Sequence, residues 1–129
     1  MKEKNKSQTL SAHILLAHGS KDPRWRKPFE MILDNCKISS PKKKFCLCYL
    51  ELCKPSLIDT VQELKKNNPN ISSIIIHPIF LSAGIHVNKD ILSIVSDLKG
   101  IHPEIKFKLK VVVGENILVK DAIHKVITS

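Results

Sequence analysis

Residues 74–86 read IIIHPIFLSAGIH, and the arrangement of the rest of the chain follows from this stretch. Its first part is mostly apolar, which predicts a buried strand that ends near Pro78. The chain then turns at Gly84, presents His86, and enters an amphipathic segment that begins near Asn88. In an open α/β sheet, ligands bind at the carboxyl edge, in the loops that follow the parallel strands. The sequence therefore predicts a strand, a ligand-binding loop and a helix, in that order.

A second histidine follows the first predicted strand in the same way. Residues 13–17 read HILLA, a short apolar run that is typical of a buried parallel strand. His18 and Gly19 come next, in a loop rich in turn-forming residues. Beyond this loop, apolar residues recur at three- and four-residue spacing, which predicts a helix that begins at Asp22 or Pro23. The two histidines thus occupy equivalent places after two strands.

The remaining segments continue the alternation of strands and helices. The pattern predicts strands at residues 45–52, 71–78 and 107–113, and helices after Ser56, over residues 88–98 and from Ile117 onwards. Such an order with short connections requires a parallel sheet with right-handed crossovers and helices on both faces. We predict one α/β domain with a four-stranded sheet over residues 11–129, after a flexible tail over residues 1–10.

The composition narrows the classes of function. The chain has 129 residues, 43% of them hydrophobic, and a formal net charge of +9. No apolar run approaches the ~20 residues of a membrane span, and the charged N-terminus lacks the apolar region of a secretory signal, so we expect a cytoplasmic protein. The charge favours anionic partners. Nucleic acid is disfavoured because arginine occurs only at Arg24 and Arg26 and aromatic residues are few.

Several common site signatures are missing from the sequence. Cys46, Cys48 and Cys53 cluster but do not form the two paired knuckles of a structural zinc site. We interpret them as reduced cysteines that pack as small hydrophobic residues. Neither a glycine-rich nucleotide loop nor a Gly-x-Ser-x-Gly nucleophile elbow is present. The sequence therefore gives no support to structural zinc or to nucleotide binding.

Three polar residues fall just past the carboxyl ends of successive predicted strands: His18, Glu51 and His86. Such positions face one shared crevice. Imidazole binds first-row metals such as cobalt, nickel and iron, and it accepts a proton near neutral pH. A carboxylate can orient a histidine, bind the metal or take a proton. A purely structural role for each histidine is the alternative, and we interpret His77, inside the third strand, as a hydrogen-bonded core or interface residue.

Four stretches of the chain, taken together, resemble a known family. Residues 15–25 read LLAHGSKDPRW, residues 49–57 read YLELCKPSL, residues 77–86 read HPIFLSAGIH and residues 113–115 read VGE. In this order and spacing they resemble the small class II chelatases of the CbiX type, from about Ile14 to the C-terminus. The resemblance implies a chelatase-like, flavodoxin-like half-unit. It also implies insertion of a divalent metal into sirohydrochlorin, a modified tetrapyrrole with eight carboxylates.

The resemblance also implies roles for individual residues. His18 is the metal ligand and proton acceptor, and His86 is the second metal ligand. Glu51 is a candidate supporting residue because of its position after the second strand, and the resemblance does not assign it a role. The substrate-contacting loop comprises Leu81, Ser82, Ala83, Gly84, Ile85 and His86. The position of Lys54 lines the substrate site in relatives, where it is often acidic. Lysine is a departure from that pattern, although it can pair with a substrate carboxylate.

The implied partners are sirohydrochlorin, a divalent metal and a second copy of the chain in a homodimer. No cofactor is expected beyond the metal substrate. Cobalt insertion for cobalamin synthesis is the favoured reaction, iron insertion for sirohaem is the nearest alternative, and nickel is a third. The types of ligand do not distinguish between these metals, because a ligand type determines the relative affinity for each metal and not the metal that is used in the cell. A metal or tetrapyrrole carrier on the same scaffold is the non-catalytic alternative.

Overall fold

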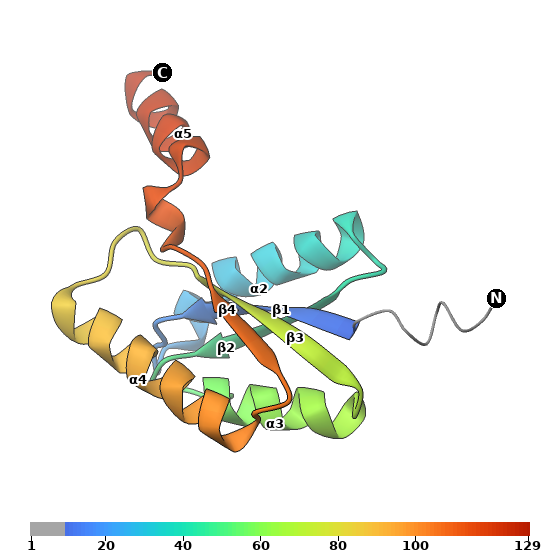
Figure 1. Ribbon diagram of the computed structural model, residues 1–129. Helices are drawn as coiled ribbons and strands as arrows, with labels where there is room; N and C mark the ends of the chain where they lie inside the picture. The colour runs from blue at the N-terminus through green and yellow to red at the C-terminus, as the bar shows by residue number, and fades with distance from the viewer. Residues whose placement is uncertain (1–9) are drawn as a thin grey trace.

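Strands and helices alternate along the chain and build one parallel sheet with helices on both faces (Figure 1). The computed structural model describes residues 10–129. The strands are β1 (Leu10–Ala17), β2 (Lys44–Tyr49), β3 (Ile71–Pro78) and β4 (Lys106–Leu109). The helices are α2 (Pro23–Ser39), α3 (Leu57–Asn67), α4 (Ile85–Ile101) and α5 (Ile117–Thr128), with a 3-10 turn, η1 (Val113–Glu115), before α5. The predicted fold class is confirmed.

The sheet has the strand order β2-β1-β3-β4, and every neighbouring pair of strands is parallel. On the central strand β1, Leu15 is aligned with Leu47 of β2 and with His77 of β3. β1 and β3 are thus neighbours, although α2, β2 and α3 separate them in the sequence. Their loops leave the sheet side by side, at the switch point where open α/β sheets bind ligands.

The hydrophobic core lies between the sheet and the helices α3 and α4. Ala12, Ile14 and Leu16 of β1 are fully buried, because every second side chain of a strand points to the same face. Each helix buries one stripe at three- and four-residue spacing, which matches the helical period. The stripes consist of Leu57, Val61 and Leu64 in α3 and of Ile91, Val95 and Leu98 in α4.

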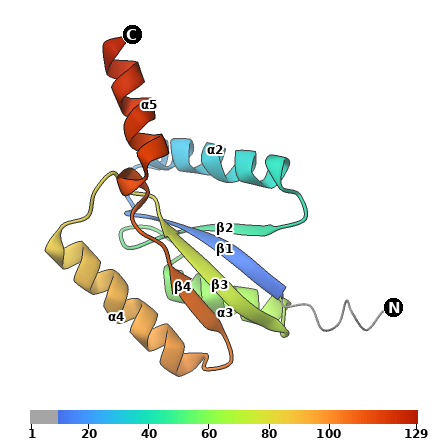
Figure 2. The same ribbon diagram turned by 45° about the horizontal axis from the view of Figure 1, so that its top comes forward.

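Among the described residues, α2 is the helix that covers the opposite face of the sheet (Figure 2). Asp22 begins α2, since its carboxylate accepts a hydrogen bond from the Arg24 N–H at 2.9 Å, and Pro23 suits the first turn because it lacks an N–H. None of the residues of α2 is buried. Ile32 remains 45% exposed. The apolar side of α2 therefore borders an open part of the sheet.

α5 extends away from the rest of the structure in both views (Figures 1 and 2). The Asn116 side chain caps it by accepting a hydrogen bond from the Leu118 N–H at 2.8 Å. No residue of α5 is buried, and Leu118 and Val126 are 75% and 76% exposed. The predicted helix is thus present, but most of its apolar surface is uncovered. None of the helices within residues 10–129 is long and apolar enough to cross a membrane.

The boundaries of the first two strands differ from the prediction. Leu10, assigned to the tail, is the first residue of β1 and pairs with Ile71 of β3; residues 1–9 of that tail lie outside the described residues. The second strand ends at Tyr49 rather than at residue 52. The strand cannot extend to residue 52, because Leu52 has a φ of 72°, which an extended strand does not allow.

The last two elements of the βαβ unit also differ from the prediction. α4 begins at Ile85, with Gly84 as a cap that makes no side-chain hydrogen bond, rather than near Asn88. This places His86 in the first turn of a helix and not in a loop. The fourth strand ends at Leu109, which is aligned with Ile76 of β3, rather than at residue 113. The Lys110 N–H still donates to the Ile76 carbonyl at 2.9 Å, but the next ladder bond would need an N–H from Pro78, which proline lacks.

Candidate active site

Backbone hydrogen bonds hold together the segments that leave the central strands. The Glu51 N–H, after β2, donates to the His18 carbonyl, after β1, at 3.0 Å. On the other side of β1, the Ile79 N–H, after β3, donates to the Leu16 carbonyl at 2.9 Å. The three segments predicted to carry the site therefore start from one edge of the sheet.

Gly19 brings the loops after β1 and β2 into close contact. Its φ is +111°, a conformation that side-chain-bearing residues rarely adopt. A Cβ atom at this position would lie 1.8 Å from the Glu51 carbonyl oxygen. Only glycine lets the two backbones approach this closely. The His-Gly dipeptide in the sequence is therefore a structural requirement for the position of His18 relative to Glu51.

His18 and Glu51 form the central pair of the site. The His18 Nε2 atom lies 3.2 Å from the Glu51 Oε2 atom, and the two side chains are 43% and 56% exposed. The His18 Nδ1 atom lies 3.4 Å from the Gly19 carbonyl oxygen. A carboxylate at this distance orients the imidazole. Because both groups remain accessible to water, the pair can also bind a metal that has open coordination positions.

A large, mainly apolar cavity lies beside this pair. Its volume is about 760 Å³. The lining includes His18 together with aromatic side chains from α2 and from the loop after β3, namely Trp25, Phe29 and Phe80. The Phe80 ring meets the His18 ring edge-on, with 6.4 Å between the ring centroids. Apolar cavities with a few polar groups are the usual sites of small-molecule binding, and this one suits a flat, largely apolar ring system.

His86 is not brought together with the central pair. Within residues 10–129, no three His, Cys, Asp or Glu side chains lie close enough to hold one metal ion, so His86 does not join His18 and Glu51 in a cluster. Leu81 and Ile85 of the predicted substrate loop are 68% and 74% exposed. The loop from Leu81 to Gly84 is thus accessible to a ligand, and its first residue, Leu81, lines the same cavity as His18.

Lys54 lies in the segment after β2 that also carries Glu51. It is exposed, and the peptide bond between Lys54 and Pro55 is cis. The Pro55 carbonyl accepts a hydrogen bond from the Tyr49 N–H at 2.9 Å, which closes this segment back onto the end of β2. Lys54 is therefore at the same sheet edge as the central pair.

The sequence profile of the CbiX family matches residues 12–129. The chain belongs to the CbiX family. Among curated CbiX-like proteins, the sirohydrochlorin cobaltochelatase of Methanopyrus kandleri is 27% identical over 95 residues, which cover 74% of this chain and 62% of that relative. The chain thus spans less than two thirds of the length of that protein. The resemblance inferred from the four sequence stretches is confirmed at the level of the family.

Solved structures support the same assignment. A crystal structure described as a cobalamin (vitamin B12) biosynthesis CbiX protein from Marinobacter aquaeolei VT8 has a TM-score of 0.80 and 31% identity, over 92% of this chain and 94% of that chain. SirB from Bacillus subtilis with Fe3+ has a TM-score of 0.77 at 19% identity, and the sirohydrochlorin chelatase SirB from Bacillus subtilis subspecies spizizenii in complex with cobalt has 0.78 at 20%. These two share the fold, and this chain covers 46% and 49% of their lengths and 91% of its own.

One pair of residues in this CbiX-family chain was not predicted from the sequence. The His13 Nδ1 atom lies 3.0 Å from the His77 Nε2 atom, and His13 also contacts the Phe45 ring at a centroid distance of 5.3 Å. All three side chains line the cavity that contains His18. The period-two alternation of strands could have found the pair, since it puts both histidines on the face opposite the core.

The surroundings of this pair favour neutral imidazoles. Burial, followed by the charges of Lys43 and Lys110, lowers the pKa of His13. Burial, followed by His13 and Lys110, lowers the pKa of His77. A hydrogen bond between two imidazoles needs one donor and one acceptor nitrogen. Two neutral rings satisfy this requirement, so the pair is a structural hydrogen bond at neutral pH.

Proposed function

We propose that this CbiX-family protein is a chelatase that inserts a divalent metal into sirohydrochlorin. The observation that carries the proposal is the pair of His18 and Glu51, 3.2 Å apart, of which His18 lines an apolar cavity of about 760 Å³. Metallation of a tetrapyrrole requires a metal with open coordination positions and a base that removes two pyrrole protons. An accessible imidazole beside a carboxylate supplies a ligand and a base at one point of the cavity.

The roles of the residues follow from this chemistry. His18 binds the metal and, when a pyrrole nitrogen takes its place on the metal, accepts one of the two pyrrole protons, while the second proton leaves to water. Glu51 orients the His18 ring and stabilises the imidazolium that forms. His86 is the second metal ligand. Because His86 stands apart from the central pair, the proposal requires that the loop of Leu81 to Gly84 moves toward His18 when substrate binds.

The substrate class is supported by the shape and the charge of the protein. The aromatic and aliphatic lining of the cavity fits the face of a macrocycle, with Leu81 to Ile85 as the contact loop. The net charge of +9 attracts a polycarboxylate. The exposed Lys54, at the edge that carries Glu51, is placed to pair with one of the substrate carboxylates. No cofactor beyond the metal substrate enters this reaction.

Cobalt is the metal that we propose, in a reaction for cobalamin synthesis in the cytoplasm. The name of the Methanopyrus kandleri relative, a sirohydrochlorin cobaltochelatase, supports this choice. Iron insertion is the second candidate, because a SirB structure with the same fold contains Fe3+. Histidine and carboxylate ligands accept both metals and nickel as well, so a direct comparison of the metals is required.

An anaerobic metallation assay tests the proposal. The protein is incubated with sirohydrochlorin and with Co2+, Fe2+ or Ni2+ in turn, and the absorbance change of the macrocycle gives the rate. We expect the highest rate with Co2+ and a loss of roughly 100-fold or more in His18→Ala and His86→Ala. The exposed His124→Ala serves as the matched control. A protein that binds both substrates without accelerating metallation would be a carrier, which contradicts the enzyme assignment.

We also propose a homodimer, in which the apolar side of α5 packs against a second copy. Leu118, Ile123 and Val126 lie on this side, and they are 75%, 39% and 76% exposed. A lone helix with such a surface requires a partner. In addition, this chain covers about half of the SirB chains with the same fold, so a second copy would supply a second half.

Light scattering after size exclusion tests the homodimer. The parent should have twice the chain mass of 14.6 kDa. Val126→Asp places a charge on the apolar side of α5 and should give the monomer mass, whereas His124→Asp, on the opposite side of the helix, should leave the dimer intact. A parent of single-chain mass at concentrations well above those of the assay contradicts the proposal.

A further inference from the structure

We propose that Gly114 is a positioning residue, which fixes the wall of the site at Phe80 and Leu81 and connects that wall to α5. Gly114 lies in η1, far in the sequence from His18 and His86. The inference rests on the proposed function for the identity of the substrate. The contacts that carry it are backbone contacts, and they are the same whichever metal is inserted.

The contact between Gly114 and the loop after β3 is unusually close. The Gly114 N–H donates to the Phe80 carbonyl at 2.9 Å, and Gly114 is buried. A Cβ atom at this position would lie 1.8 Å from the Leu81 carbonyl oxygen and 2.5 Å from the Leu81 Cα. These neighbours are backbone atoms, which cannot rotate away as a flexible side chain can. Glycine is therefore required at position 114 because there is no room for a Cβ atom.

The loop residues held by Gly114 form part of the candidate site. Phe80 and Leu81 line the same cavity as His18, together with Val113 of η1. The Phe80 ring lies edge-on to the His18 ring, at a centroid distance of 6.4 Å. A displacement of the loop backbone at Leu81 would therefore change the distance between the wall of the cavity and the metal-binding imidazole.

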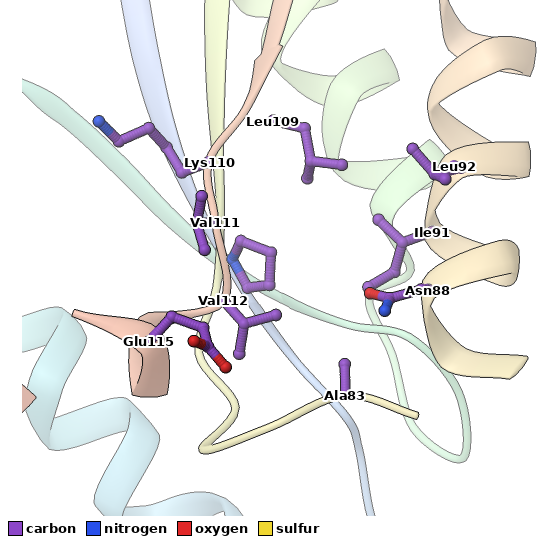
Figure 3. A pocket seen from close by; sticks show the side chains of 10 residues that line it. Ala83, Asn88, Ile91, Leu92, Leu109, Lys110, Val111, Val112 and Glu115 are labelled. Atoms are coloured by element: carbon purple, nitrogen blue, oxygen red, sulfur yellow. The ribbon is translucent and has the colours of Figure 1, made fainter. Parts of the chain in front are cut away.

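Beyond Leu81 the loop has no comparable anchor. Within the described residues, no backbone hydrogen bond joins residues 81–83 to another segment. A cavity of about 380 Å³ lies between the loop, α4 and the chain after β4. Figure 3 shows Ala83 on one side of this space, with Val112 and Glu115 on another. The contact at Gly114 is thus the last fixed point before the free part of the substrate loop.

The same contact joins the loop to the C-terminal helix. The Asn116 N–H donates to the Val113 carbonyl at 3.0 Å, and the Asn116 carbonyl accepts from the Lys120 N–H at 3.1 Å. The Asn116 side chain caps α5 as well. η1 and the first turn of α5 therefore form one hydrogen-bonded unit. Seating α5 on a second copy would fix this unit, and through Gly114 it would fix the start of the substrate loop.

The variant Gly114→Ala tests the inference, with Gly100→Ala as the matched control, because a Cβ at Gly100 meets nothing within 4 Å. Two affinities are measured separately: that for sirohydrochlorin without metal, by fluorescence quenching, and that for Co2+ without sirohydrochlorin, by calorimetry. We expect Gly114→Ala to bind sirohydrochlorin at least roughly tenfold more weakly, since displacements near 1 Å are costly at such sites. Its Co2+ affinity without sirohydrochlorin should stay within roughly twofold of the parent, because His18 and Glu51 are held by Gly19 and His86 is proposed to approach them only when substrate binds.

A loss of affinity for sirohydrochlorin without a loss of affinity for Co2+ distinguishes a positioning role of Gly114 from general damage to the fold. A folded Gly114→Ala variant that binds sirohydrochlorin as tightly as the parent overturns the inference, and so does an equal loss of both affinities. If the parent binds sirohydrochlorin but does not metallate it, the proposed enzyme activity fails while the role of Gly114 is still decided by the binding data.

A second measurement on the parent protein covers the case in which Gly114→Ala does not fold. Hydrogen exchange followed by NMR reports the protection of the Gly114 amide directly. We expect protection comparable to that of the amides of β3, because the Gly114 N–H is buried and donates to Phe80. Exchange as fast as that of the exposed amides of residues 82–83 would show that the contact does not hold the loop, and would refute the inference.

Discussion

Replacement of Gly19 by alanine is the most direct test of how the backbone sets up the central pair. The new Cβ would lie 1.8 Å from the Glu51 carbonyl oxygen, whereas ordinary contacts begin at 3.4 Å. The two loops must therefore separate by roughly 1.5 Å. If they separate along this contact, the distance between His18 Nε2 and Glu51 Oε2 grows from 3.2 Å to roughly 4.5–5 Å, beyond the range of a hydrogen bond.

The expected magnitude follows from this displacement. Misplacement of a reacting group by about 1 Å costs on the order of 100-fold in rate, which corresponds to about 2.7 kcal/mol of activation free energy. The φ of +111° adds a separate cost to stability of roughly 1–3 kcal/mol for any residue other than glycine. Gly19→Ala should thus lower the metallation rate about 100-fold while the folded state is still populated.

The assay is anaerobic metallation of sirohydrochlorin under saturating conditions, with the free energy of unfolding measured in urea on the same samples. Gly100→Ala is again the control, because it adds the same methyl group in open space. A folded Gly19→Ala protein with a rate within roughly threefold of the parent would mean that the separation of His18 from Glu51 does not govern the reaction.

Three further predictions concern stability and reactivity. The pKa values of His13 and His77 are lowered from 6.5 in the folded protein. The contribution of the neutral pair to the free energy of unfolding is therefore complete above that pH and is lost as pH falls through the folded-state pKa values. The urea midpoint of the parent should accordingly decrease between about pH 7.5 and pH 5, and that of His77→Leu should decrease by less. Ile14→Ala should lower the free energy of unfolding by roughly 3–4 kcal/mol, because Ile14 is fully buried, and a loss below about 1 kcal/mol would contradict the described core. Burial raises the pKa of Cys48 to about 12, so iodoacetamide should label Cys53 well before Cys48 in the folded protein, and equal labelling by mass spectrometry would refute this.

The sequence predicted the sheet and its site edge because these depend on short-range patterns. Each of the features used for the prediction can be recognised within one short segment of the chain. These features are the apolar runs of β1 and β3, the polar cap Ser56 and the glycine after His18. The boundaries that failed depend on partners elsewhere. The predicted second strand cannot reach residue 52 because Leu52 has a positive φ, and β4 ends where its neighbour β3 offers Pro78, which has no N–H for the next ladder bond.

The two features missed at the site have similar explanations. His13 and His77 are 64 positions apart and meet only because β1 and β3 are adjacent. The start of α4 at Ile85 was hidden because Ile85 is 74% exposed, so it does not fit the buried stripe that marks the rest of the helix. As a result, His86 was predicted in a loop, although it lies in the first turn of α4.

One face of the sheet packs against α3 and α4, and the other face borders the cavity beside α2. The two faces of each strand are therefore under different constraints. In β1, Ala12, Ile14 and Leu16 face α3 and α4 and hold the fold together, whereas His13 and Leu15 face the cavity. Neighbouring residues of β1 thus have different requirements, one for the stability of the core and the next for the shape of the cavity. In a survey of substitutions along this strand, changes at Ala12, Ile14 and Leu16 would reduce the amount of protein that accumulates, whereas changes at the partly exposed His13 would alter what the accumulated protein can bind.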